Sequence, residues 1–156
     1  MISAGRILSI FRTKGGSGGS SWTADELPQP QMRLLERELI KGDRLSVARV
    51  KSKDNWFALT SSQLISSVDG RVRQTRLADI IRVAPETRAM QLVEVKHSGG
   101  PLDLKLADGS PLTVWSDGGK PFVGLLNVFS YIVKMNQGRR SGRARLHRPD
   151  RGSRRG

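Results

Sequence analysis

The chain contains no cysteine, which excludes a disulfide framework and a thiolate metal site. Histidine is almost as scarce, with two residues in 156. His97 precedes a Gly-Gly turn and His147 lies among arginines, so neither belongs to a catalytic triad or a metal-ligand spacing. No apolar run approaches the roughly 18–20 residues that a transmembrane helix needs. These absences disfavour nucleophilic catalysis, metal chemistry and insertion into a membrane.

The aspartates also form no convincing acid–base pair. Asp69, Asp108 and Asp117 each precede a glycine, where an aspartate serves the geometry of a turn. Asp79 is expected to cap a tight corner by accepting hydrogen bonds from nearby backbone N–H groups. We therefore predict that the chain is not an enzyme, and that it takes no cofactor, no metal ion and no small-molecule substrate.

Acidic residues are few, 14 against 27 lysines and arginines, and the formal net charge is +13. Residues 138–156 alone hold eight arginines against one aspartate, a net charge of +7. An arginine-rich tail attracts polyanions, which means RNA, DNA or an anionic membrane surface. The predicted polyanion-binding residues are Arg139, Arg140, Arg143, Arg145, Arg148, Arg151, Arg154 and Arg155.

The N-terminal residues 1–26 carry no acidic side chain before Asp25, and residues 15–21 consist only of glycine and serine. That composition predicts a flexible linker that detaches a mostly disordered terminus. An interfacial membrane helix and an organelle transit peptide are the alternatives, since residues 1–12 hold no apolar run long enough for a secretory signal. Residues 27–42 then contain a short helix, because Met32, Leu35 and Leu39 fall at helical spacing before Gly42.

From residue 43 onward apolar residues alternate with polar ones, which indicates strands. Asp69-Gly70 is a strong signal for a two-residue hairpin. Turn signals recur about every ten residues, which favours hairpins of a sandwich or small barrel over βαβ units. Trp56, Phe57 and Trp115 are expected in the core. The predicted strands cover residues 45–50, 56–60, 63–68, 71–77, 80–84, 90–97, 102–106 and 112–115.

The apolar period changes to that of a helix after residue 119. Pro121 stands in its first turn, and Gly138 stands where a helix would end. We predict an amphipathic helix that closes a domain over residues 43–137, followed by a disordered tail over residues 138–156. The apolar positions of this helix are Phe122, Leu125, Leu126, Phe129, Ile132 and Val133.

Residues 56–65, WFALTSSQLI, followed by Asp69-Gly70 and by Leu77-Ala78-Asp79-Ile80, resemble the pattern of bacterial PH-like domains. The resemblance covers about residues 43–137. It implies a mainly β fold, a PH-like antiparallel seven-stranded half-barrel capped by the C-terminal amphipathic helix, with the short helix of residues 27–42 before it. Members of this superfold bind phosphoinositides, peptides or other proteins.

Two pairs of basic residues are candidate contacts for an anionic ligand. Lys51 and Lys53 lie in the first hairpin, where lipid-binding relatives of the superfold hold phosphates, although Asp54 stands beside them. Arg71 and Arg73 share one face of a predicted strand and form a cationic ridge.

Three functions follow from these features. The first is a soluble, cytoplasmic adaptor module that binds a protein partner through a sheet edge or a groove beside the last helix. The second is a nucleic-acid-associated protein, within a ribonucleoprotein assembly, whose tail contacts RNA or DNA. The third is a peripheral membrane protein anchored by residues 1–12.

Overall fold

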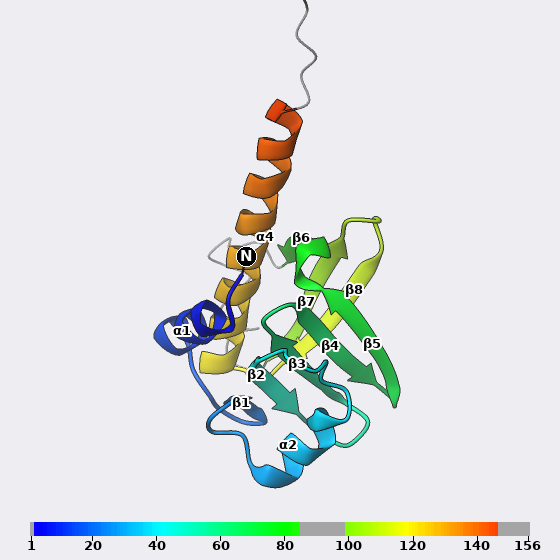
Figure 1. Ribbon diagram of the computed structural model, residues 1–156. Helices are drawn as coiled ribbons and strands as arrows, with labels where there is room; N and C mark the ends of the chain where they lie inside the picture. The colour runs from blue at the N-terminus through cyan, green and yellow to red at the C-terminus, as the bar shows by residue number, and fades with distance from the viewer. Residues whose placement is uncertain (1, 85–98, 147–156) are drawn as a thin grey trace, which may run out of the picture.

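The structure is a computed structural model that describes residues 2–84 and 99–146, with side chains to residue 144. The strand predicted over residues 90–97 and both histidines therefore lie outside the described residues. In the described part, eight strands and three α-helices follow one another as α1, β1, α2, β2–β8 and α4, and a 3-10 turn, η1 (Leu77–Asp79), connects β5 to β6 (Figure 1).

The strands form two antiparallel sheets. The first has the order β1-β2-β3-β4-β5 and the second the order β6-β7-β8. The strands of the first sheet are β1 (Ser21–Thr23), β2 (Leu45–Val50), β3 (Trp56–Thr60), β4 (Gln63–Val68) and β5 (Arg71–Arg76). Those of the second are β6 (Ile80–Ala84), β7 (Gly100–Leu106) and β8 (Pro111–Ser116).

The sequence prediction of antiparallel strands followed by a helix is confirmed, but the seven-stranded half-barrel is not. The described strands divide into sheets of five and three that do not close on each other, and β1 is an additional strand that the alternation did not indicate. Helices α1, α2 and α4 also contribute much of the fold, so "mainly β" describes it only in part.

The β4–β5 hairpin shows how local sequence determines one of these turns. Asp69 and Gly70 have φ angles of 50° and 79°, the pair of positive values that a type I′ turn requires. Val68 lies opposite Arg71, so the loop contains only these two residues. Glycine adopts such angles freely and aspartate tolerates them, which is why the dipeptide predicted this hairpin correctly.

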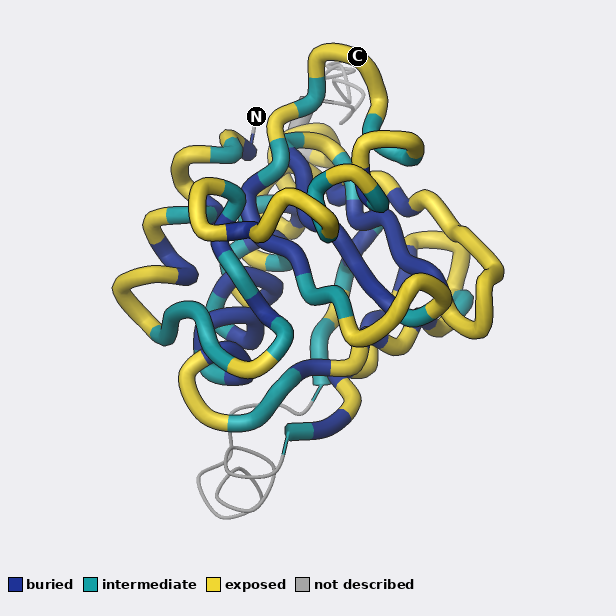
Figure 2. Tube along the Cα trace, turned by 90° about the horizontal axis from the view of Figure 1, so that it is seen from below, coloured by how far each residue is buried: buried dark blue, intermediate teal, exposed yellow. Residues whose placement is uncertain are grey.

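Helix α4 (Lys120–Leu146) supplies the centre of the core. Phe122, Leu125, Phe129 and Ile132 are fully buried and belong to one apolar cluster with residues of both sheets. Figure 2 shows the buried stretches gathered inside the molecule, with exposed loops around them. Because these side chains recur at helical spacing, the amphipathic pattern predicted this buried face correctly.

The N-terminal segment is an ordered part of the core, which corrects the expectation of a disordered terminus. Helix α1 (Ala4–Lys14) is capped by Ser3, whose side chain accepts a hydrogen bond from the backbone N–H of Arg6 at 3.1 Å. Ile7 and Phe11 are fully buried in the same cluster as α4. The helix lies against α4 (Figure 1), so its apolar face is covered by protein.

The glycine- and serine-rich segment is not a free linker either. β1 pairs with β2, with Trp22 opposite Ala48. Gly15 lies directly against the backbone of α4 near Gly124, so the two helices approach closely. Small residues at this point permit the contact, and composition alone had suggested flexibility instead.

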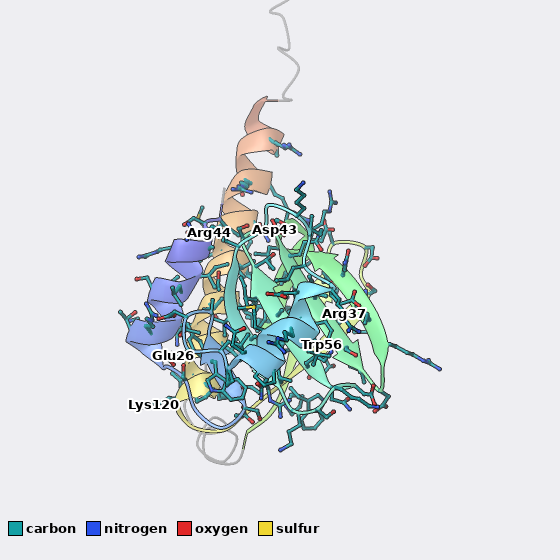
Figure 3. The ribbon with its side chains drawn as sticks, turned by 60° about the horizontal axis from the view of Figure 1, so that its bottom comes forward. Glu26, Arg37, Asp43, Arg44, Trp56 and Lys120 are labelled. Atoms are coloured by element: carbon teal, nitrogen blue, oxygen red, sulfur yellow. The ribbon has the colours of Figure 1, made fainter. Side chains whose placement is uncertain are left out.

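Helix α2 (Gln29–Glu36) covers the other face of the first sheet. Leu35 is fully buried and belongs to a second apolar cluster with Ile65 and Trp56, and Figure 3 shows Trp56 beside this helix. The first sheet is therefore covered on both faces, which explains why every residue of β3 is buried.

Helix α4 continues past Gly138, which corrects the prediction that it ends near residue 137. Asn136 is buried, and its side-chain amide donates hydrogen bonds to the carbonyl oxygens of Leu77 and Ile80 at 2.7 and 2.8 Å. These bonds hold the helix just before the glycine. A glycine costs only about 1 kcal/mol in a helix interior, and the arginines that follow are good helix formers.

The close approach of α1 and α4 leads to a first prediction. A Cβ atom at Gly124 would lie 2.7 Å from Cδ2 of Phe11 and 3.0 Å from its carbonyl oxygen. We expect Gly124→Ala to lower the free energy of unfolding by about 1–3 kcal/mol, because overpacking forces the helices apart. Urea denaturation followed by far-UV circular dichroism measures this change.

Gly138→Ala is the matched control, since nothing lies within 4 Å of its Cβ position. This variant should keep or gain stability, by up to about 1 kcal/mol, through its higher helix propensity. Equal stabilities for the two variants would contradict the close helix contact.

Candidate functional site

An open cleft lies between the two sheets, and its volume is about 340 Å³. We call it the β8 cleft. Its walls are the end of β2, the start of β3, the end of β4 and the second half of β8. The lining residues are Arg49, Lys51, Asn55, Trp56, Phe57, Ser66, Ser67, Val68, Asp69, Thr113, Val114 and Trp115.

The free edge of β8 opens into this cleft. β8 is the last strand of its sheet, and β7 is its only neighbour among the described strands. Successive residues of a strand point to opposite faces, yet Thr113, Val114 and Trp115 all line the cleft. Three consecutive lining residues indicate that the edge of the strand, with its backbone groups, borders the hollow.

Trp115 is the most exposed large apolar residue of the described chain, with 57% of its surface accessible. Its predicted place in the core is wrong. Leu112 and Val114 take the inward positions of β8, so the alternation turns Trp115 outward, opposite Pro101 on β7. Trp56 and Phe57 are buried, as predicted.

Asp117 fastens the end of β8 to the first sheet. Its carboxylate accepts hydrogen bonds from the backbone N–H of Ser20 at 2.9 Å and from the hydroxyl of Ser21 at 2.7 Å. Arg49 Nε lies 3.3 Å from Asp117 Oδ1, close enough for an ion pair, although its N–H is not aligned for a hydrogen bond. Burial raises the pKa of Asp117, but the Ser21 hydroxyl and the Arg49 charge together hold it below its ordinary value.

The sequence had assigned Asp117 to a turn only. Its partners Ser20 and Ser21 stand 97 and 96 residues away, so no local signal could identify this contact. Asp108 does serve the turn that was predicted for it, because it accepts the backbone N–H of Ser110 at 2.9 Å. Asp79 instead binds the guanidinium of Arg76 at 3.0 and 3.1 Å rather than capping the corner in the expected way.

The predicted anion-binding residues do not form one cluster. Lys51 lines the β8 cleft and also, together with Lys53, a shallow hollow next to α2. Arg71 and Arg73 are exposed on β5, and Arg73 reaches the carbonyl oxygen of Pro111 at 3.5 Å. Neither β5 arginine lines the cleft.

Part of the arginine-rich tail forms the C-terminal turns of α4. Arg139, Arg140 and Arg143 line a second groove together with Arg76 and Asp79. The sequence could not place Arg76 beside the tail, because the corner and the helix are far apart along the chain. The side chains of Arg145 and Arg148 to Arg155 lie outside the described residues.

Some of the polar groups that line the β8 cleft are engaged in structural contacts. The Ser67 hydroxyl donates to the carbonyl oxygen of Asp54 at 2.9 Å, and Arg49 faces Asp117. Within residues 2–84 and 99–146, no three His, Asp or Glu side chains gather in a way that could hold a metal ion. The helices of the same residues are all too short or too polar to cross a membrane.

Removal of the Asp117 carboxylate gives a second prediction. Asp117→Ala leaves the Arg49 charge and the Ser20 and Ser21 donors without their partner. We expect it to lower the free energy of unfolding by about 1–3 kcal/mol at neutral pH. Glu36→Ala, which removes an exposed carboxylate of α2, should change stability by less than about 0.5 kcal/mol.

The stabilities of the native protein and of Asp117→Ala should respond differently to acid. Because folding lowers the pKa of Asp117, its contribution is fully present above about pH 4, the ordinary value for a carboxyl, and disappears as pH falls below it. The stability difference between the native protein and Asp117→Ala should therefore shrink below about pH 4. A difference that stays constant down to pH values well below this would contradict the assignment. Denaturant titrations over a pH series measure it.

Comparison with known proteins found no relative of this chain. The chain matches no protein-family model, no curated protein and no solved structure. The likeness to PH-like domains therefore rests on the motifs of residues 56–65, 69–70 and 77–80.

Proposed function

We propose that the chain is a non-catalytic binding module that holds an extended segment of a protein partner in the β8 cleft. The observation that carries this proposal is the free edge of β8 bordering a hollow beside the exposed Trp115. An extended peptide can add to such an edge as a further strand, with main-chain hydrogen bonds for affinity and side-chain pockets for specificity.

The exposed apolar side chains of the cleft support an extended peptide as the ligand. Trp115 and Val68 both line it and are 57% and 52% exposed, which makes them the two most exposed large apolar residues of the described chain. Tryptophan is among the residues that dominate binding energy at protein interfaces. Lys51 lies at the border, where it can meet an acidic side chain of the partner.

The rigidity of the walls favours binding as well. Asp117 holds β8 against the first sheet, and Asn55 Oδ1 accepts the backbone N–H of Asp69 at 3.2 Å, which joins the β2–β3 loop to the β4–β5 hairpin. A site held in this way loses little conformational entropy when a ligand binds.

The arrangement of strands also supports a PH-like module over residues 43–137. β2 to β5 form one antiparallel meander, β6 to β8 form a second, and α4 follows. The motif resemblance implies the same sequence of parts. Under this proposal α1 and β1 are additions to the module. Helix α1 packs against α4, and β1 extends the first sheet by pairing with β2.

Selection of peptides tests the proposal. A displayed library of short peptides is selected against the intact chain, and the dissociation constants of the enriched peptides are measured by fluorescence. Trp115→Ala should weaken binding about 10–30-fold, because a large apolar contact is lost. Ile40→Ala is the matched control, since Ile40 is an exposed apolar residue outside the cleft, and it should leave binding unchanged.

Hydrogen exchange then locates the peptide. Backbone amides of β8 should exchange more slowly in the complex, while those of β5, another edge strand, should not change. Peptides that bind native protein and Trp115→Ala equally well, or that protect β5 instead, would refute the cleft as the binding site.

A further inference from the structure

We propose that the C-terminal half of α4 and the η1 corner form a second site, which binds the phosphate backbone of single-stranded nucleic acid. The site is the groove lined by Arg76, Asp79, Arg139, Arg140 and Arg143, of about 700 Å³. We call it the arginine groove. It is separate from the β8 cleft and does not depend on the function proposed for that cleft.

The groove is held in place from within the fold. The side-chain amide of Asn136 donates hydrogen bonds to the carbonyl oxygens of Leu77, the first residue of η1, and of Ile80, the residue after it. Asn136 is only 3% exposed, so these two bonds are shielded from water. They fix the distance between the corner that carries Arg76 and the helix that carries the other three arginines.

The charge of the groove is not balanced by the described residues. Four arginines face a single carboxylate, that of Asp79, which is already engaged by Arg76 at 3.0 Å. Arg139, Arg140 and Arg143 form no ion pair with any carboxylate of the described chain. Cations that lie close together repel one another. An anion that binds among them relieves this repulsion, so such a group attracts anions strongly.

The shape of the charge favours a polymer over a single phosphate. α4 projects beyond the rest of the described fold (Figure 1), and residues 137–144 are exposed throughout. Arg139 and Arg143 are four residues apart, so they share one face of the helix and lie about 6 Å apart along its axis. A row of charges along a helix matches a chain of phosphates.

The composition of this segment favours nucleic acid over a membrane surface as the partner. Residues 137–143 contain no apolar side chain, whereas a helix that lies on a membrane needs an apolar face to insert. All eight cations of residues 138–156 are arginines and none is a lysine. Guanidinium groups bind phosphate oxygens in pairs and stack on bases, and unpaired bases are accessible only in single strands.

Fluorescence anisotropy with a labelled oligouridylate tests the site on the intact chain. The triple variant Arg139→Ala, Arg140→Ala, Arg143→Ala should bind about 10–100-fold more weakly near physiological salt. The slope of log affinity against log salt should become shallower by about 2, since each phosphate contact on a single strand contributes about 0.7. Unchanged far-UV circular dichroism confirms that the exposed substitutions leave the fold intact.

A second triple variant controls for charge alone. Arg33→Ala, Arg37→Ala, Lys41→Ala removes the same charge from exposed positions in and after α2, and it should bind at least about tenfold more tightly than the groove variant. Arg76→Ala, on the corner, should weaken binding severalfold, whereas the exposed Arg33→Ala on α2 should not change it. Equal losses in the two triple variants, with no loss in Arg76→Ala, would overturn the groove.

The probe identifies the partner. Oligothymidylate and duplex DNA are titrated beside the RNA, and preference for either single strand over the duplex supports the proposal. Vesicles of phosphatidylserine and phosphatidylcholine are the remaining arm. Binding to anionic vesicles without binding to any oligonucleotide would overturn it and assign the groove to a membrane surface.

Discussion

The fold depends on the burial of one apolar face of α4. Phe122, Leu125, Phe129 and Ile132 are fully buried and touch the cluster that α1 and both sheets share. Burying each such side chain contributes roughly 1.5–3 kcal/mol, as an upper value. Two sheets that do not pair with each other are held together by this helix, so both candidate sites depend on its position. The β8 cleft lies between the sheets that α4 joins, and the arginine groove lies on α4 itself.

Features determined by neighbouring residues were predictable from the sequence. The Asp69-Gly70 hairpin, the strands around it and the start of α4 each follow from a local pattern of turn residues or periodicity. The point at which α4 ends was not predictable in this way. Gly138 is a helix-ending residue by type, yet α4 continues, because one glycine costs a helix only about 1 kcal/mol and the arginines that follow favour it. Asn136, just before it, is bonded to carbonyl groups 56 and 59 residues away, which no local pattern could indicate.

The N-terminal segment shows the same limit more strongly. Glycine and serine between residues 15 and 21 indicate flexibility by composition, but in this chain small residues allow two helices to touch. What the sequence could not reveal is which surface would receive α1. The residues of the candidate sites were also predictable only in part. Lys51, which the sequence suggested as an anion contact, lines the cleft, whereas the places of Trp115 and Asp117 depend on the direction of an alternating strand and on partners nearly a hundred residues away.

The two proposed sites lie toward opposite ends of one rigid helix. The β8 cleft ends at Trp115, shortly before α4 begins at Lys120, and the part of α4 that lines the arginine groove begins at Asn136. Sixteen residues of helix separate these points, roughly 24 Å. The sites share no lining residue, and substitutions so far apart usually contribute independently to free energy. A protein segment in the cleft and a nucleic acid in the groove would therefore bind together without competing. The chain would then join the two by geometry alone, with α4 as the spacer and no conformational change needed to couple them.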